Sequence, residues 1–372
     1  MKRVSSRRVA GISAAGVLAL TLAACGGGSE GSGNGGGSEG EGLSGTIAGS
    51  GASSQENAVE GWIAGFMEAN TDAAVSYDPT GSGTGREQFI NGTVQFAGSD
   101  AALDADEMAA AQERCNDGEI LELPLYISPI AVIYNLPELN DTNLNLTPSV
   151  LAQIFNGDIT SWNAPEIAES NPDVDLPDLP IVPVNRSDDS GTTENFTEYL
   201  SAAAPDDWTH DPAGLWPIEG TQSGAQTSGM LEVVGGAEGT IGYADASRVG
   251  DLGSVAVGVG DEFVPFSPEA AAAVVDVSPP AEDATDTVLT IDLARDTQES
   301  GAYPIVLVSY SIACQTYDSA EEAELVQGYL GYVASEEGQE RASQPDVAGS
   351  APISGELREN VEAALETISA AG

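Results

Sequence analysis

The sequence has very little positive charge. Its 372 residues include 11 Lys plus Arg and one His against 59 Asp plus Glu, which gives a formal net charge of −48 at pH 7. Four of the eleven basic residues fall within the first eight positions, so the chain beyond residue 24 carries seven arginines and no lysine. A surface this acidic repels nucleic acid and anionic lipid headgroups, which excludes functions that depend on a basic patch.

Histidine is almost absent, and this weakens any prediction of an enzyme. A serine nucleophile needs a positioned base, but the only histidine, His210, stands in a predicted surface loop and no Gly-x-Ser-x-Gly elbow accompanies it. The acidic stretches 173–175 and 283–286 could bind calcium only nonspecifically. The sequence therefore predicts a protein that is not an enzyme and has no resident metal or cofactor, with a serine hydrolase as the weakest alternative.

Cysteine is scarce as well, and the first of the three has a specific context. A basic first turn is followed by a short apolar, Ala-rich run over residues 9–24, which predicts a secretion signal at residues 1–24. The Leu-Ala-Ala triplet before Cys25 resembles the bacterial lipobox, which implies cleavage before Cys25 and a diacylglyceryl group on its sulfur. An ordinary secreted protein with an incidental cysteine is the alternative. The first interpretation places the protein outside the cytoplasm, anchored to the cell membrane as a lipoprotein.

The other two cysteines, Cys115 and Cys314, remain as an even pair in an exported chain. Such a pair favours one disulfide over two buried thiols, and the bond would join segments about 200 residues apart. Residues 25–42 are nearly all Gly, Ser and Glu and cannot bury apolar surface, so they predict a flexible tether. The globular part is therefore expected to begin near Leu43.

About 330 residues follow the tether, enough for two lobes with ordinary cores. Apolar spacing predicts helices at Glu56–Asn70, Asp104–Arg114, Pro148–Asn156, Thr193–Ala203 and Leu357–Ile368. Buried or alternating runs predict strands at Ala74–Tyr77, Val94–Phe96, Ile120–Asn135, Ile181–Val184 and Gly239–Tyr243. This alternation predicts an α/β fold.

Ser53, with Glu56 three residues later, has the pattern of a capping box at the start of the first of these helices.

Three segments rich in Gly, Ser and Thr each precede a predicted helix, and together they suggest a binding site. They are Gly49–Ser54, Gly81–Gly85 and Arg186–Thr192. A helix N-terminus offers unpaired N–H groups and the positive end of the helix dipole, so three that converge would bind an anion without many cations.

Two charged residues make the anion site more specific. Asp100 follows a predicted strand directly, at the end where α/β sites lie, although a lone Asp there often caps a helix. Arg186 also ends a strand and stands four residues before a Ser-Gly-Thr helix start, so guanidinium, hydroxyls and amides can face one oxyanion. A surface Arg paired with Asp188 is the alternative for Arg186.

These motifs resemble, in order and spacing, the phosphate-binding protein (PstS) family of the bacterial high-affinity phosphate ABC transporter. The resemblance runs from Leu43 to the C-terminus and rests on Gly49-Ser50-Gly51-Ala52-Ser53, Trp62, Gly81-Ser82, Gly98-Ser99-Asp100, Arg186 to Phe196 and Gly239 to Tyr243. It implies a two-lobed periplasmic-binding-protein fold of type II, a Venus flytrap with two hinge crossovers. Lobe one is then residues 43–126 plus 304–372 and lobe two residues 127–303, so that Cys115 and Cys314 share lobe one.

The resemblance also implies the ligand set, the role and the partners. Phosphate would be held between the lobes and delivered to the permease subunits of the transporter. One departure concerns Ser54, where many members have Phe. In those relatives this position contributes a backbone N–H, which Ser54 retains, whereas the apolar lid that Phe provides is no longer expected. Asp188 would orient Arg186. The implied phosphate ligands are Ser53, Ser54, Ser82, Asp100, Arg186, Ser190, Gly191 and Thr192.

Asp100 needs a physical reason, because a carboxylate against a dianion should weaken binding. Phosphate near neutral pH still carries a proton that the carboxylate can accept, whereas sulfate is fully ionised, so Asp100 would favour one oxyanion and repel the other. Asp100 and Arg186 together thus argue against a carrier for sulfate or molybdate. A surface adhesin or sensor that kept the fold and lost uptake stays open as a further alternative.

Overall fold

The structure is a computed structural model that describes residues 42–116 and 118–371. The predicted signal peptide at 1–24, the predicted lipid attachment at Cys25 and nearly all of the predicted tether lie outside the described residues. Within the described ranges, every helix is too short or too polar to serve as a membrane span.

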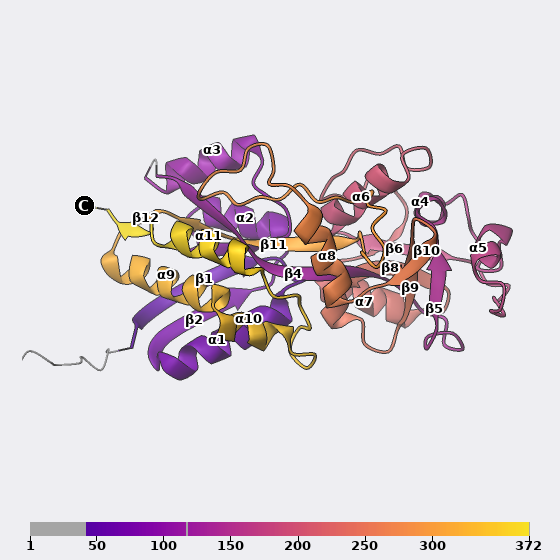
Figure 1. Cartoon of the computed structure of the whole chain (residues 1–372), viewed down its shortest axis with the longest axis horizontal. Coiled ribbons are helices and arrows are strands. Elements are labelled where there is room, and N and C mark those ends of the chain that lie inside the picture. The colour runs from indigo at the N-terminus through magenta and orange to yellow at the C-terminus, as the bar shows by residue number, and fades with distance from the viewer. Residues whose placement is uncertain (1–41, 117, 372) are drawn as a thin grey trace, which may run out of the picture. The chain divides into compact units, whose positions relative to one another are not determined.

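An 11-stranded sheet runs through the described part of the chain (Figure 1). Its main path has the order β2-β1-β3-β11-β4-β8-β6-β7. Off this path, β9 pairs with β4, β5 and β10. The strands of the main path are β1 (Ser44–Gly51), β2 (Asp72–Asp78), β3 (Phe96–Ser99), β4 (Ile120–Tyr134), β6 (Val182–Arg186), β7 (Gln222–Gly224), β8 (Thr240–Asp245) and β11 (Val306–Cys314). The other three are β5 (Asn143–Leu146), β9 (Gly253–Val259) and β10 (Glu262–Pro265).

Strand β4 connects the two halves of this sheet. All of its 15 residues are buried, as expected from its apolar run. Residues 120–129 pair with β11, whereas residues 130–134 pair with β8. The first half therefore contains β1, β2, β3 and β11, and the second half contains β5 to β10. The predicted α/β class and two-lobed fold are confirmed.

An irregularity in β4 lies at the predicted crossing between lobes. Its pairing with β11 shifts register, since Tyr126 faces Ser309 whereas Pro124 faces Tyr310. Proline has no N–H to give to the ladder, so a bulge at this place is the expected response, and bulges bend and twist a strand. The bend falls beside the predicted lobe boundary at Tyr126/Ile127.

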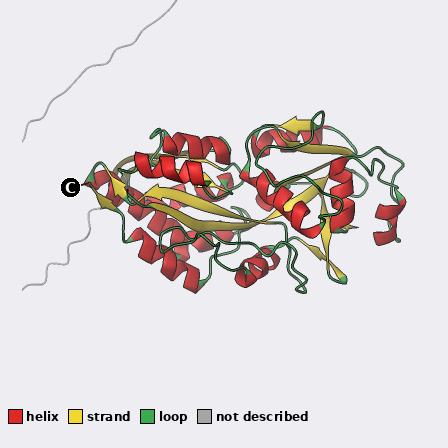
Figure 2. Cartoon of the chain, turned by 90° about the horizontal axis from the view of Figure 1, so that it is seen from above, coloured by secondary structure: helices red, strands yellow, loops and turns green. Residues whose placement is uncertain are grey.

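Helices cover both faces of the sheet, as Figure 2 shows from above. The first half is covered by α1 (Glu56–Ala69), α2 (Ser82–Ile90), α3 (Ala105–Arg114), α9 (Ala320–Ala334), α10 (Glu336–Ser343) and α11 (Gly355–Leu365). The second half is surrounded by α4 (Pro148–Asn156), α5 (Pro165–Ser170), α6 (Gly191–Ala203), α7 (Gln226–Gly236) and α8 (Pro268–Val277). A short 3-10 helix, η1 (Ala246–Arg248), follows β8, and the pair β12 (Thr316–Tyr317) and β13 (Ser369–Ala370) lies near the C-terminus.

The start of α1 differs from the prediction. The helix is amphipathic as expected, with Val59, Trp62 and Phe66 buried. The predicted capping box is wrong, because Gln55 is the N-cap and no side chain caps the helix. The hydroxyl of Ser53 is instead engaged by Thr227 of α7, 174 residues away, and this tertiary contact outweighs the local cap.

A folded-back segment at residues 279–292, here called the arm, leaves the second half and lies on the first. Its two limbs are joined by backbone hydrogen bonds, among them Ala281 N to Thr290 O at 2.9 Å. Its outer part pairs with β4, since Glu122 N donates to Thr287 O at 3.0 Å and Leu289 N donates to Glu122 O at 2.9 Å. The sequence boundaries assign the arm to lobe two, and those boundaries stay a prediction.

The two remaining cysteines form a disulfide, which confirms that prediction. Cys115 ends α3 and Cys314 ends β11, their Cα atoms are 5.5 Å apart, and both side chains are fully buried. The bond closes a loop with a sequence separation of 199 within the first half of the fold.

Replacing Cys115 and Cys314 together by alanine is expected to lower the free energy of unfolding by about 2 to 5 kcal/mol, because the cross-link restricts the unfolded chain over a very long loop. Urea denaturation measures the change. Anion affinity should stay as in wild type, since the bond lies within one half. A loss of affinity in the folded variant would contradict this placement.

Candidate functional site

The three Gly, Ser and Thr segments meet at the carboxyl ends of parallel strands. The first leaves β1 and its Ala52 N donates to Gly98 O at 2.8 Å, while Gly81 N donates to Gly51 O at 2.8 Å. The third segment, at the start of α6, touches this group, because a Cβ placed on Gly191 would lie 2.8 Å from Cβ of Asp100. The convergence predicted from sequence is therefore present in the structure.

Asp100 lies at the centre of this cluster and is only 3 % exposed. Ser54 Oγ donates to both carboxylate oxygens at 2.8 Å, and Thr192 Oγ1 donates to Oδ2 at 2.8 Å. Burial raises the pKa of this carboxyl, and the bonds from Thr192 and Ser54 together with the charge of Arg186 oppose the rise. Asp100 is thus a buried acid with hydroxyl donors from both halves of the fold.

Arg186 ends β6 and is also 3 % exposed. Its Nε donates to Asp188 Oδ1 at 2.8 Å and its Nη2 to Oδ2, a two-pronged pairing that fixes the plane of the guanidinium. Burial opposes ionisation of Asp188, but Arg186 and the N–H of Gln226 outweigh it and hold the pKa of Asp188 below its ordinary value. The sequence offered pairing with Asp188 as the alternative to an anion contact. This pair is present, but it is buried, and among the described residues Nη1 of Arg186 has no protein acceptor.

Two helix starts contribute the remaining polar groups. Ser190 caps α6, accepting from Thr193 N at 3.2 Å, so its hydroxyl proton is still available to an acceptor. Ser82 begins α2, and its Oγ accepts from Asp100 N at 3.2 Å. The backbone of Gly81 has a φ of +100°, and a Cβ there would lie 2.7 Å from a carboxylate oxygen of Asp188, so glycine is required both for the turn and for the close approach.

Ser53 lies in the same region but faces the second half. Its Oγ is 3.0 Å from Oγ1 of Thr227 and accepts from Thr227 N at 3.0 Å. The structure therefore brings together all eight predicted ligand residues and Asp188, with the hydroxyls of Ser53, Ser54 and Thr192 already hydrogen-bonded to protein groups.

Sequence reasoning missed several residues that hold this cluster together. Asn195 Nδ2 donates to Asp100 O at 2.6 Å and to Gly191 O at 2.8 Å, so it joins the two halves through backbone atoms. Arg295 in turn donates a hydrogen bond to Oδ1 of Asn195, and it also donates to Glu198 at 2.9 Å and to Val306 O at 2.9 Å. The available signal for Arg295 was that it is one of only seven arginines after residue 24.

Two ion pairs connect the halves beside the cluster. Arg248 of η1 pairs with Glu56 of α1. On α2, Arg86 Nη2 lies 3.8 Å from an oxygen of Asp189, while its Nε is bound to Glu107 at 3.0 Å. With the Asp100, Ser53 and Asn195 bonds, these pairs place the two halves in direct contact around the cluster.

The other candidates weighed from the sequence were His210 and the acidic stretches. His210 stacks edge-on against Trp208, and its Nε2 lies 3.3 Å from Oδ1 of Asn156 rather than from a serine hydroxyl. No three His, Cys, Asp or Glu side chains among the described residues are grouped so as to hold a metal ion.

Comparison with known proteins gives the same family as the motifs. A family model described as a PBP superfamily domain matches residues 36–337. The chain is 34% identical over 384 residues to the phosphate-binding protein PstS2 of Mycobacterium bovis, covering 99% of this chain and 100% of that protein. It is 33% identical over 332 residues to PstS 3 of Mycobacterium tuberculosis, covering 86% and 88%.

Solved structures support the fold. A high-affinity periplasmic phosphate-binding protein named PfluDING, determined with phosphate bound, superposes with a TM-score of 0.67 at 20% identity and covers 86% of this chain and 93% of that chain. A phosphate ABC transporter substrate-binding protein from Clostridium perfringens, described as putative and also with bound phosphate, gives a TM-score of 0.58 at 20% identity over 82% and 99%.

Proposed function

This chain belongs to the PstS family of phosphate-binding proteins, and from that premise we propose that it captures inorganic phosphate between its two lobes and delivers it to the permease of an ABC transporter. The observation that carries the proposal is the buried cluster in which the carboxylate of Asp100, the guanidinium of Arg186 and the start of α6 come together. Solute-binding proteins are not enzymes, and the cluster is built for binding.

The proposed ligands combine dipoles with a single cation. Nη1 of Arg186 supplies the charge, and the first-turn amides and hydroxyls of α2 and α6 supply hydrogen bonds at helix N-termini. Because the chain as a whole is strongly acidic, these short-range bonds must overcome a repulsive long-range field. The full proposed set is Ser53, Ser54, Ser82, Asp100, Arg186, Ser190, Gly191 and Thr192, with Asp188 orienting Arg186.

Lobe closure on the anion is part of the same proposal. With lobes at residues 43–126 plus 304–372 and at 127–303, the cluster takes Asp100 from one lobe and Arg186 from the other. The Arg248–Glu56 and Arg86–Asp189 pairs then act across the cleft and favour the closed arrangement. A ligand that completes both sides of the cluster stabilises this arrangement further.

We propose that the protein lies outside the cytoplasm and is held to the cell membrane by a lipid on Cys25. The support is the Leu-Ala-Ala-Cys sequence at residues 22–25 after an apolar run, followed by the Gly, Ser and Glu tether. Mass spectrometry of the protein purified from membranes would detect the lipid, and a Cys25→Ala variant should be released into the soluble fraction.

Calorimetric titration of the mature protein with phosphate, sulfate and arsenate at two pH values tests the proposal. Phosphate and arsenate should both bind, since each keeps a proton near neutral pH, and sulfate should bind far more weakly. Equal binding of sulfate, or no binding of phosphate, would overturn the proposed ligand.

Replacing Ser54 by alanine is expected to shift the pH dependence of phosphate binding. Ser54 Oγ donates to both oxygens of Asp100, so its loss leaves the buried carboxylate less well solvated and raises the pKa of Asp100 further. Asp100 would then be protonated, and lose its acceptor role, at a higher pH than in wild type as the solution is acidified. Titrations across the acidic range measure the shift. A Ser54→Thr variant keeps the hydroxyl and should restore the wild-type profile; identical profiles for the alanine variant would remove Ser54 from this role.

A further inference from the structure

Ser309 of β11 is a buried serine beside the anion cluster, and it is not one of the proposed ligands. The residue is 1 % exposed, and its Oγ has no hydrogen-bond partner among the described residues. Strand β11 runs through the middle of the sheet, between β3 and β4. A buried polar atom without a partner is costly, so a hydroxyl of this kind next to a binding site requires an explanation.

The register of β11 against β3 places Ser309 opposite Asp100. Tyr310 pairs with Ser99 in this antiparallel ladder, so one step beyond this last pair Ser309 faces Asp100. Residues directly opposite each other in an antiparallel pair project their side chains to the same face of the sheet, with their Cα atoms about 4.5 to 5.5 Å apart. Ser309 therefore shares the face on which Asp100 contributes to the cluster.

Two neighbours of Ser309 on β11 support this orientation. Ser311, on the same face, lines a small internal cavity together with Gly98, its partner in the ladder. Tyr310, the residue between the two serines, projects to the opposite face, where its hydroxyl accepts from Ile291 N of the arm at 3.1 Å. The alternation along the strand thus directs the side chain of Ser309 toward the anion cluster.

The donors on Asp100 indicate what a further hydroxyl does there. Thr192 Oγ1 donates to Oδ2 and Ser54 Oγ donates to both oxygens, each at 2.8 Å. Burial raises the pKa of Asp100, and the hydroxyls of Thr192, Ser54 and Ser309 oppose the rise. A hydroxyl has a single proton to donate, so the proton that Thr192 gives to Asp100 is not available to a bound anion. Donation by Thr192 to the anion therefore leaves the buried carboxylate with one donor fewer.

We propose that Ser309 takes the place of Thr192 on the carboxylate of Asp100 when the anion binds. This inference rests on the proposed function and deepens it. The hydroxyl of Thr192 turns from Asp100 to an oxygen of the anion, and the hydroxyl of Ser309 then donates to Asp100. The carboxylate keeps its donors and stays ionised while it accepts a hydrogen bond from the proton of phosphate. Ser309 is thus a positioning residue, which acts on the ligand through Asp100.

The test is calorimetric titration of the mature protein with phosphate at several pH values from neutral into the acidic range. Ser309→Ala should weaken binding about tenfold at neutral pH, the effect of losing one hydrogen bond to a charged group. On acidification its affinity should fall at a higher pH than that of wild type, because Asp100 in the complex has one donor fewer. The other ionisable groups acting on Asp100 keep their charge in this range, since a guanidinium such as Arg186 does not lose its proton and burial raises the pKa of Tyr77.

Ser311→Ala is the matched control for Ser309→Ala. It removes a buried hydroxyl from the same face of the same strand, two residues away, and should leave both phosphate affinity and its pH dependence unchanged. Urea denaturation without phosphate separates positioning from a structural role. The free energy of unfolding of Ser309→Ala should match wild type, because the hydroxyl has no hydrogen bond to lose. If stability fell together with affinity, Ser309 would be a structural residue and the proposal would be wrong.

A double-mutant cycle with Thr192→Val tests the exchange of donors itself. Without the Thr192 hydroxyl no donor leaves Asp100 on binding, so Ser309→Ala should weaken phosphate binding much less in that background than in wild type. The same loss in both backgrounds, or wild-type affinity of Ser309→Ala at every pH, would overturn the proposal. Failure of the wild-type protein to bind phosphate would instead remove the proposed function on which the inference rests.

Discussion

Replacing Arg186 by glutamine is expected to weaken phosphate binding by about 2 to 5 kcal/mol, roughly thirtyfold to several thousandfold. Arg186 is the cation of the proposed ligand set, and it is 3 % exposed, so its charge acts with little screening by water. Glutamine keeps a polar group but loses the charge and the two-pronged pairing with Asp188. The side chain of Asp188 would then add an unbalanced negative charge beside the anion. Isothermal titration with phosphate measures the loss.

Arg341→Gln is the matched control for Arg186→Gln. It makes the same chemical change on a surface arginine of α10, whose partner Glu68 is 3.3 Å away and largely exposed. Phosphate affinity should be unchanged, because surface pairs of this kind contribute little and the site is elsewhere. If Arg186→Gln stayed within twofold of wild type while folded, the guanidinium would have no part in anion binding.

The main features of the site could be predicted from sequence because they depend on local patterns. Strand β3 ends directly before Asp100 and β6 ends in Arg186, so within each half the sequence places these groups, with the Gly-Ser-Thr segments before helices, at the carboxyl ends of parallel strands. The disulfide could be favoured for a similar reason, since it needed only an even pair in an exported chain.

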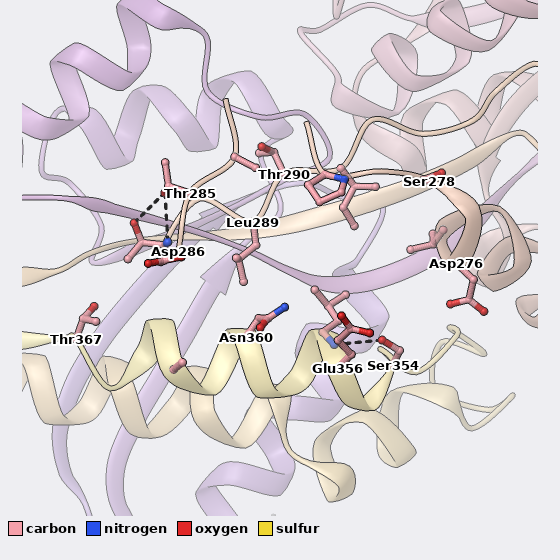
Figure 3. Close-up of a pocket in the computed structure, with 17 residues that line it drawn as sticks. Asp276, Ser278, Thr285, Asp286, Leu289, Thr290, Ser354, Glu356, Asn360 and Thr367 are labelled. Carbon is pink, nitrogen blue, oxygen red and sulfur yellow. Dashed lines mark hydrogen bonds between the residues drawn. The ribbon is translucent and has the colours of Figure 1, made fainter. Parts of the chain in front are cut away.

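What the sequence could not give are the contacts made between distant segments. Ser53 has the local pattern of a helix cap, yet Thr227, which lies 174 residues further on, occupies its hydroxyl. Arg295 and Asn195 stabilise the cluster through backbone carbonyl groups, and such bonds leave no pattern in the side chains of the partners. The cavity between α11 and the arm (Figure 3) likewise exists only because the arm folds back onto β4.

The hydroxyl of Ser54 shows how a departure from the family pattern acquires a role. Many relatives have a phenylalanine there, as the resemblance implies, and the expectation from sequence was limited to the retained backbone N–H. In the structure the side chain is fully buried and donates to both oxygens of Asp100. The change therefore places a polar donor where many relatives have an apolar side chain, directly on the residue proposed to select the anion.

Replacing Asp100 by asparagine is expected to reduce the preference for phosphate over sulfate by about two orders of magnitude or more. A site built to accept a ligand's proton rejects analogues without that proton by on the order of 10⁴ to 10⁵, because its acceptor is then left unpaired against a negative charge. Asparagine removes the charge, and its side-chain N–H can donate a hydrogen bond to a sulfate oxygen. Competition titrations with both anions measure the ratio.

Stability provides an independent check on the same variant. Burial raises the pKa of Asp100 in the folded protein above its unfolded value, so the native state takes up the proton more readily than the unfolded chain does. The contribution of Asp100 to stability is therefore greatest below the unfolded pKa and falls as the pH rises through the raised, folded value. An asparagine side chain cannot titrate in this way, so the stability of the Asp100→Asn variant relative to wild type should increase across that window in urea denaturation series. Two results together would contradict both roles of Asp100: an unchanged preference for phosphate over sulfate, and a stability difference between variant and wild type that does not change with pH. Asp100 would then neither have a raised pKa in the folded protein nor accept the proton of the bound anion.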